Sequence, residues 1–208
     1  MIDGASTDGT PAWLETQHAR LAHFSSAPDA GVYDAMNRAV AAARGEWIFF
    51  LGADDLVADS DVLSSIAASL QQSSAGVVAG QAIYSDGRRY RFNPRANPCA
   101  RNFVHHQATF YRRSLFSAHG GFDLSFKILA DYEFNLRLIR AGIRFEASSV
   151  TIATCGTGGL SDSGNWRVYA EEIHARHRHY PAWRCLPWDA LSVARYLRKK
   201  IIRSLAKN

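Results

Sequence analysis

The chain has 208 residues, of which 47% are hydrophobic and 21% charged, and its formal net charge is +5. This is the composition of an ordinary globular protein, and the length fits one α/β domain. Three distant cysteines without a CxxC spacing argue against a disulfide framework or a zinc knuckle, and no apolar stretch reaches the roughly 20 residues that span a bilayer. We therefore expect a cytoplasmic protein that is neither secreted nor membrane-spanning. The basic excess gathers in residues 195–207 rather than interleaving with aromatic side chains, which argues against a nucleic-acid partner.

The N-terminal segment reads as the end of a strand at residues 1–2, a polar loop over residues 3–10 and a helix over residues 12–22. A strand, a small polar loop and a helix start together form a cradle suited to an anion or a nucleotide. The Walker A motif is excluded because Thr10 stands where a lysine is required. A well-capped turn is the alternative interpretation of this loop.

The stretch from residue 26 to residue 56 predicts a turn at 28–31, a helix and a buried strand. Tyr33, Met36 and Val40 recur at the spacing of one helix face, so this helix packs against a sheet, and Gly45 ends it. A continuous apolar run at residues 47–51 is typical of a strand buried on both faces.

Two carboxylates, Asp54 and Asp55, follow that strand at its carboxyl end. Ligands of open α/β sheets bind beyond the carboxyl ends of the strands, so these acids are placed to hold a divalent cation that accompanies a phosphate. The alternative is an acidic turn in which Asp55 caps the next helix.

Downstream patterns predict a helix over residues 62–70, a strand over 76–84, a hairpin turn at 85–87 into a strand at 89–92, an irregular loop over 93–102 and a strand over 143–154. A helix over residues 128–140 places Leu129, Tyr132, Leu136 and Ile139 on one face, with Asp131 at the edge of this stripe. Taken alone, Asp131 is either a general base or a helix N-terminal acid stabilised by the helix dipole.

The C-terminal segment offers three further features. Residues 156–161 form either a loop that closes over a ligand or a plain linker. The helix that carries His174, His177 and His179 also carries Glu171, Glu172, Arg176 and Arg178, which favours a solvated face over a metal site. Residues 188–205 form a basic amphipathic helix, which suits either the surface of an anionic membrane or docking on the domain.

Several short motifs carry a resemblance. Four of them resemble, in order and spacing, the nucleotide-sugar half of a family 2 glycosyltransferase: DGASTDGT at 3–10, PDAGVYDAMN at 28–37, GEWI at 45–48 and LGADD at 51–55. The likeness continues with HHQATFYR at 105–112, GGFD at 120–123 and ADYE at 130–133, and it covers about residues 1–161.

The resemblance implies the GT-A fold, an α/β architecture with a mostly parallel sheet and helices on both faces, over residues 1–161. A C-terminal helical extension follows over residues 162–208. The implied donor-binding residues are Asp3, Ser6, Asp29, Gly31, Asn37 and Asp54. Asp54 and Asp55 would hold Mg²⁺ or Mn²⁺, and Asp131 would be the catalytic base. Adjacent side chains of a strand point to opposite faces, so we expect one of the two neighbouring histidines to face the site, and we choose His106, with Gln107, for the acceptor side.

The implied reaction is inverting transfer of a sugar from a UDP- or GDP-linked donor to a hydroxyl of a glycan or lipid-linked acceptor, in polysaccharide or glycolipid biosynthesis. Two departures weigh against it. Gly52 stands where many members carry the first acid of a DXD triplet, and the strand and helix that precede the Asp3 loop in members, a unit of roughly 30 residues, are not in this sequence. We therefore expect the sheet to lack its opening strand. The alternative function is a degenerate nucleotide-sugar-binding domain without catalysis.

Overall fold

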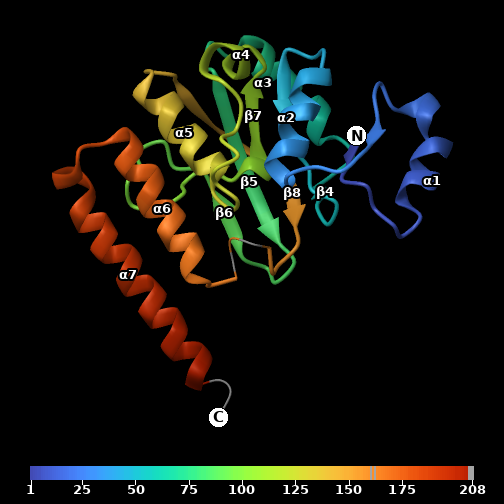
Figure 1. Ribbon diagram of the computed structural model, residues 1–208. Helices are drawn as coiled ribbons and strands as arrows, with labels where there is room; N and C mark the ends of the chain where they lie inside the picture. The colour runs from blue at the N-terminus through green and yellow to red at the C-terminus, as the bar shows by residue number, and fades with distance from the viewer. Residues whose placement is uncertain (160, 162, 206–208) are drawn as a thin grey trace.

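The computed structural model describes residues 1–159, 161 and 163–205, and shows helices and strands interspersed along the chain (Figure 1). The helices are α1 (Thr10–Thr16), α2 (Val32–Ala42), α3 (Val62–Gln72), α4 (Ser114–His119), α5 (Ala130–Arg140), α6 (Trp166–His179) and α7 (Ala182–Leu205), with 3-10 helices η1 (His18–Arg20) and η2 (His106–Ala108). The strands are β1 (Ile2–Asp3), β2 (Ser25–Ser26), β3 (Trp47–Phe49), β4 (Leu56–Val57), β5 (Val77–Tyr84), β6 (Arg89–Arg91), β7 (Thr109–Arg112) and β8 (Phe145–Cys155).

The α/β class is confirmed, but the sheet is mixed rather than mostly parallel. The larger sheet has the order β3-β7-β5-β8-β4, with β6 beside β5, and β1 pairs with β2 in a separate parallel sheet. Within the larger sheet β5 and β8 are parallel, whereas the other pairs are antiparallel. The chain leaves β5 through the β6 hairpin and returns in β7 without the crossover helix that a parallel pairing requires. As a result β3, β5 and β8 run in one direction, and β4, β6 and β7 run in the other.

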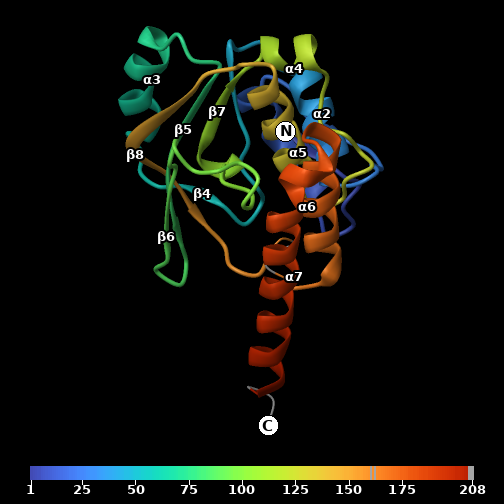
Figure 2. The ribbon, with the colours of Figure 1, turned by 90° about the vertical axis from the view of Figure 1, so that its left-hand side faces the viewer.

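Helices cover both faces of this sheet (Figure 2). On one face α3 contributes Val62, Ile66 and Leu70 to a core with β5, β7 and β8. On the other face α2, α4 and α5 share a larger core, in which the rings of Phe116 and Phe134 stack with their centroids 4.8 Å apart. The second core buries nearly all of α5. Asp131 is therefore 4% exposed, deeper than the edge position that its helical spacing predicts.

The solvated face predicted for α6 is wrong, because two of its charged side chains are buried. Glu172 is 5% exposed and Arg176 is fully buried. Arg176 donates from Nε to Asp189 Oδ1 at 3.0 Å and from Nη2 to Ser192 Oγ at 2.7 Å, both on α7. Its Nη1 donates to the Cys99 carbonyl at 3.1 Å. The charged face of α6 is therefore closed by α7, which supplies the partners that a buried cation requires.

The two C-terminal helices pack on the rest of the chain. Ala175, Tyr180 and Cys185 belong to the same buried cluster as α5. The proposed boundary between residues 161 and 162 remains a prediction: Leu160, in the expected closing loop or linker, and Asp162 lie outside the described residues. In Figure 1 the last turns of α7 extend away from the body of the protein. Within the described part of the chain, no helix has the length and apolar character needed to span a bilayer.

The α6–α7 contact leads to a stability prediction. Arg176→Ala should lower the free energy of unfolding by about 3–5 kcal/mol, because it leaves the carboxylates of Glu172 and Asp189 without their buried partner. Arg178→Ala, two residues further along α6, is the matched control. It removes an ion pair with Asp123 whose Arg178 side chain is 42% exposed, and it should cost at most about 1 kcal/mol. Urea titrations of both variants measure the difference, and equal losses would contradict the prediction.

Candidate functional site

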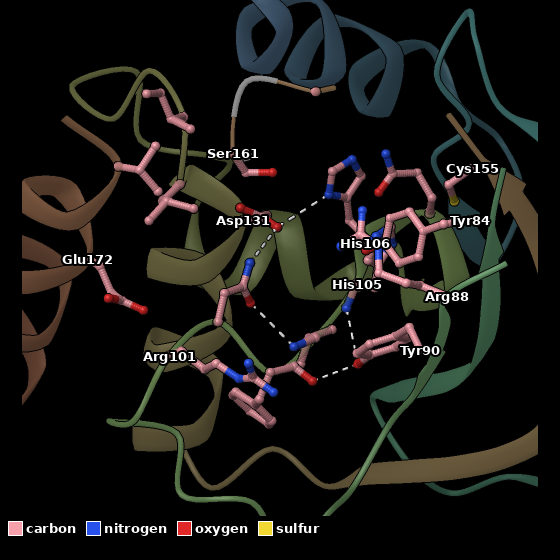
Figure 3. A pocket seen from close by; sticks show the side chains of 18 of the residues that line it. Tyr84, Arg88, Tyr90, Arg101, His105, His106, Asp131, Cys155, Ser161 and Glu172 are labelled. Atoms are coloured by element: carbon pink, nitrogen blue, oxygen red, sulfur yellow. Dashed lines mark hydrogen bonds and ion pairs between the residues drawn. The ribbon is translucent and has the colours of Figure 1, made fainter. Parts of the chain in front are cut away.

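A cavity of about 880 Å³ opens at the carboxyl ends of β5 and β8 (Figure 3). Tyr84, the last residue of β5, and Cys155, the last residue of β8, line it, and so does Gly156. Because β7 runs in the opposite direction, its amino-terminal side, with η2, reaches the same edge of the sheet. The first turn of α5 points there too, and Asp131 lies in the cavity wall.

The carboxylate of Asp131 is held by side chains from three separate segments. Its Oδ2 accepts a hydrogen bond from Asn102 Nδ2 at 3.0 Å and lies 3.2 Å from His106 Nδ1. Its Oδ1 lies 2.9 Å from the hydroxyl of Tyr33 on α2. A carboxylate offers about four lone-pair positions. The three side chains therefore occupy three of these positions.

These contacts set the charge of the site. Burial raises the pKa of Asp131, but the hydrogen bonds from His106, Asn102 and Tyr33 outweigh it and leave the pKa below that of an ordinary aspartate. Burial and the neighbouring Asp131 charge raise the pKa of Tyr33 well above its usual value. At neutral pH the site therefore holds an ionised carboxylate beside a protonated phenol.

The two neighbouring histidines both line the cavity, and so does Gln107. The expectation that only one histidine faces the site is wrong, because residues 106–108 form a 3-10 helix rather than the start of a strand, and strand alternation does not apply. Burial lowers the pKa of His105 to about 4, with a further contribution from His106, while Asp131 and Asp55 act in the opposite direction. His105 is therefore a neutral ring within electrostatic range of both acid sites.

Asp54 and Asp55 follow β3 as predicted, but their carboxylates are used differently. Asp55 is buried, and its two oxygens accept hydrogen bonds from the backbone N–H groups of Gly52 at 3.2 Å and Gly156 at 3.3 Å. Burial, together with Asp55, raises the pKa of Cys155 to about 12. Asp55 thus ties the loop after β3 to the end of β8, beside the cavity wall, whereas Asp54 is exposed.

The fit of Mg²⁺ or Mn²⁺ to these residues depends on ligands that a substrate brings. Among residues 1–159, 161 and 163–205, no three His, Cys, Asp or Glu side chains are placed to bind one metal ion. Magnesium sites of nucleotide enzymes commonly use one or two carboxylates, several waters and the substrate phosphates. The exposed carboxylate of Asp54 fits that role, while Asp55 already accepts two backbone hydrogen bonds.

The N-terminal loop gathers around Asp3. Its carboxylate accepts hydrogen bonds from the hydroxyl of Ser26 at 2.6 Å, from the hydroxyl of Ser6 at 2.5 Å and from the Ser6 backbone N–H at 3.0 Å. The hydrogen bonds from Ser26 and Ser6 lower the pKa of Asp3. Asp3 therefore joins β1 to β2 and holds the loop in place. Ser6 contributes by donating two hydrogen bonds to the Asp3 carboxylate.

Asp29 and Gly31 lie next to this loop, whereas Asn37 has another partner. A side chain at Gly4 would meet the Asp29 carboxylate at 2.7 Å, so glycine permits the turn to approach the Asp3 loop. Gly31 has a φ of 118°, a conformation that favours glycine, and immediately precedes α2. The Asn37 amide exchanges two hydrogen bonds with the backbone of Phe122, at 2.9 and 2.8 Å, and ties α2 to the segment before α5.

The cavity wall is rich in cations. The arginines that line it are Arg88, Arg89, Arg91, Arg101 and Arg195. The carboxylates that line it are Asp131 and Glu172. Both have partners within the protein: Asp131 those described above, and Glu172 an ion pair with Arg195 and a hydrogen bond from Ser192 at 2.8 Å. Arg88 is itself paired with Asp86, and Arg195 with Glu172, so the excess of positive charge at the wall comes from Arg89, Arg91 and Arg101.

Two residues that touch Asp131, Tyr33 and Asn102, are not predicted as site residues from the sequence. Tyr33 is recognised as an apolar helix position, yet a buried tyrosine needs a partner for its hydroxyl, and this is the signal that points to a polar neighbour. Asn102 lies in the segment assigned to an irregular loop, and nothing in its local sequence indicates a contact 29 residues away.

The model of the family described as Glycosyl transferase family 2 matches residues 1–140. A PGL/p-HBAD biosynthesis glycosyltransferase of Mycobacterium tuberculosis is 38% identical over 144 residues, which cover 66% of this chain and 56% of that protein. A second M. tuberculosis protein, named an uncharacterized glycosyltransferase, is 34% identical over 195 residues, which cover 87% of this chain and 72% of that protein. The chain thus spans little more than half the length of the first of these relatives.

Solved structures show the same fold at low sequence identity. TarS of S. aureus, in complex with UDP-GlcNAc, has a TM-score of 0.66 and 18% identity, over 94% of this chain and 61% of that one. A mannosyltransferase from Pyrobaculum calidifontis, in complex with GDP-Man and Mn²⁺, has a TM-score of 0.58 and 19% identity, over 99% of this chain and 69% of that one. The arrangement of helices and strands is that of the GT-A glycosyltransferases. With a family match over residues 1–140, the chain belongs to glycosyl transferase family 2.

Proposed function

We propose that the protein transfers a sugar from a nucleotide-diphosphate donor to a hydroxyl of a glycan or lipid-linked acceptor, with inversion at the anomeric carbon and Asp131 as the base. The observation that carries this proposal is a buried carboxylate in a cavity wall at the carboxyl edge of the sheet, contacted by three side chains and with a pKa below that of an ordinary aspartate. The relatives named as glycosyltransferases and the neighbour that binds UDP-GlcNAc support it.

In the proposed step, the acceptor hydroxyl donates a hydrogen bond to Asp131. As its oxygen forms a bond to the anomeric carbon, the proton passes to the carboxylate, and the bond to the diphosphate breaks with its electron pair on the leaving group. Tyr33, Asn102 and His106 hold the carboxylate so that it meets the hydroxyl from a fixed direction. Such preorganisation removes the need to orient the base during the reaction.

The donor side of the proposal uses the loops after β1, β2 and β3. Asp3, Ser6, Asp29 and Gly31 form one neighbouring group at the N-terminal loop and the turn before α2, and they would take the nucleotide. Asp54 would hold Mg²⁺ or Mn²⁺ together with the diphosphate, and Asp55 would keep the loop of Asp54 against β8. When bound, such a cation stabilises the charge of the departing diphosphate.

The acceptor side of the proposal is the wall formed by His106, Gln107 and the arginines. A wall with excess positive charge favours an acceptor that carries phosphate or carboxylate groups near its reactive hydroxyl.

The role of Asp131 is tested by Asp131→Asn. Turnover should fall by about 10²–10⁴-fold, because the amide cannot accept the proton, while calorimetric binding of UDP- and GDP-linked sugars should be unchanged. Asp61→Asn is the control, since Asp61 is an exposed residue at the start of α3, on the opposite face of the sheet. Full turnover by Asp131→Asn would reject the base. Donor binding by the wild-type protein without any product would instead support a degenerate binding domain.

The role of Asp54 is tested by donor binding with and without Mn²⁺. Asp54→Ala should weaken binding in the presence of Mn²⁺ by at least about tenfold, the effect typical of disturbing the ligands of a bound metal. Without Mn²⁺ the variant and the wild-type protein should bind equally. Asp59→Ala, a change at an exposed acid five residues further along, should retain the Mn²⁺ effect. Equal binding by Asp54→Ala and wild type in Mn²⁺ would remove Asp54 from the metal site.

We further propose that α7 brings the enzyme to an anionic membrane surface. Large apolar residues of α7 are exposed, namely Trp183, Leu186, Leu191, Val193, Leu197, Ile201, Ile202 and Leu205. Arg198 and Lys200 are also exposed on this helix. Exposed apolar side chains beside cations on one helix fit the interface of an anionic bilayer.

Flotation with phosphatidylglycerol vesicles tests the membrane contact. The protein should float at low salt and lose binding at high salt, because the attraction to anionic lipid is screened. Arg198→Glu with Lys200→Glu should weaken binding by at least roughly tenfold, since each cation near such a surface contributes about 1 kcal/mol. Arg20→Glu with Arg44→Glu makes the same change in net charge at exposed positions outside α7. Equal losses in both double variants, or no flotation of the wild type, would contradict the contact.

A further inference from the structure

The backbone that leads into α5 is held by a residue of α6. Glu171 accepts hydrogen bonds from three consecutive backbone N–H groups: Oε1 from Lys127 at 3.0 Å, and Oε2 from Ile128 at 2.8 Å and Leu129 at 3.0 Å. Leu129 is the N-cap of α5, and its own side chain supplies no cap. A carboxylate at a helix N-terminus pairs with exposed N–H groups and with the positive end of the helix dipole. Glu171 therefore fixes the position at which α5 begins.

The same backbone segment reaches the proposed base through one hydroxyl. The carbonyl of Ile128, between two of the amides held by Glu171, lies 2.7 Å from the hydroxyl of Tyr33. That hydroxyl lies 2.9 Å from Asp131 Oδ1. A tyrosine hydroxyl has a single proton, so the two acceptors share it. The position of the Ile128 carbonyl thus sets how strongly Tyr33 donates to Asp131.

Glu171 is well placed to hold this arrangement rigidly. Its side chain is 11% exposed, and it also contacts Arg167 Nε at 3.1 Å, four residues earlier on α6. The Arg167 side chain is 56% exposed, so this ion pair is weakly stabilising and does not account for the burial of Glu171. The three backbone hydrogen bonds to an ionised acceptor are the stronger contacts.

We propose that Glu171 is a positioning residue for Asp131: it fixes the backbone of residues 127–129, and through the Ile128 carbonyl and the Tyr33 hydroxyl it sets the orientation and hydrogen bonding of the Asp131 carboxylate. The catalytic part of this inference rests on the proposed role of Asp131. Glu171 lies beyond residue 140, where the family match ends. The C-terminal segment thereby contributes to the proposed active site as well as to the core.

The test uses Glu171→Gln in the full chain, with Arg167→Ala as its matched control. Glutamine offers one acceptor oxygen and places an amide donor against backbone donors, so it cannot hold all three N–H groups. The turnover number should fall by roughly 10–100-fold, the cost of a small misplacement of a catalytic group, with KM for the nucleotide sugar unchanged. Arg167→Ala retains Glu171 and its backbone contacts, and should keep both constants.

A double-mutant cycle separates positioning from a general loss of structure. Tyr33→Phe removes the hydroxyl through which Glu171 acts. The double variant Tyr33→Phe with Glu171→Gln should therefore have a turnover number no lower than that of the less active single variant. Losses that multiply in the double variant would overturn the proposal. So would wild-type turnover by Glu171→Gln.

A readout independent of activity keeps the inference separate from the assignment of the base. Carbon-13 NMR titration of the Asp131 carboxyl group should show a higher pKa in Tyr33→Phe, which removes a hydrogen bond to the ionised form. It should show a lower pKa in Glu171→Gln, because a displaced Ile128 carbonyl no longer shares the Tyr33 proton with Asp131. If Asp131→Asn retains full turnover, the base is wrong, yet the titration still tests the positioning role. An unchanged Asp131 titration in folded Glu171→Gln overturns it.

Discussion

The structure depends on keeping one charged carboxylate in a buried position. Asp131 is 4% exposed, and a carboxylate removed from water is costly unless hydrogen bonds replace its hydration. Its partners come from α2, from the loop before η2 and from η2 itself, so the chain must bring residues 33, 102 and 106 together around α5. The fold and the proposed base are thus linked: the contacts that make burial tolerable also orient the carboxylate and keep it ionised.

The same principle applies at the second acid site. Asp55 is buried and accepts backbone N–H groups from two loops, which keeps the end of β3 beside the end of β8. Asp54, its neighbour, is left exposed. A pair of acids that looks equivalent in the sequence is therefore divided into one that shapes the loop and one that is available to a ligand. With Gly52 in place of a further acid, this division leaves Asp54 as the single carboxylate for the proposed cation site.

Local patterns in the sequence predict much of the fold. The apolar spacing of α2, α3 and α5 and the hairpin between β5 and β6 appear near their predicted positions, because each depends on residues within a few positions of one another. The pairing of the strands is harder to predict from the sequence, because the direction of β7 depends on how the chain returns from β6. The clearest wrong prediction concerns α6, whose buried charged side chains the sequence places on a solvated face. Glu172 and Arg176 have the spacing of a solvated helix, and their burial depends on α7, which comes later in the chain.

The candidate site divides in a similar way. Short motifs are enough to select four candidate site residues, because loops at strand ends and the first turn of a helix have recognisable sequences. These residues are Asp54, Asp55, His106 and Asp131. Tyr33, Asn102 and Glu171 are not selected in this way, because each acts on a partner between 29 and 98 residues away through a hydroxyl, an amide or a carboxylate that is common in any sequence. Only the folded structure shows that their polar atoms contact either the Asp131 carboxylate or the backbone just before α5.

The boundary of the family match has a physical meaning in this molecule. The residues that we assign to the donor and to the base lie within residues 1–140, whereas Val168, Glu172 and Arg195, which line the cavity together with Asp131, lie beyond it. A nucleotide diphosphate and the anomeric carbon impose a fixed geometry, which suits a common structural framework. An acceptor imposes no common geometry, since acceptors differ in size and charge. In the proposed enzyme, walls supplied by α6 and α7 can therefore differ without altering the proposed donor site, provided that the carboxylate of Glu171 continues to hold the backbone before α5 and, through it, the proposed base.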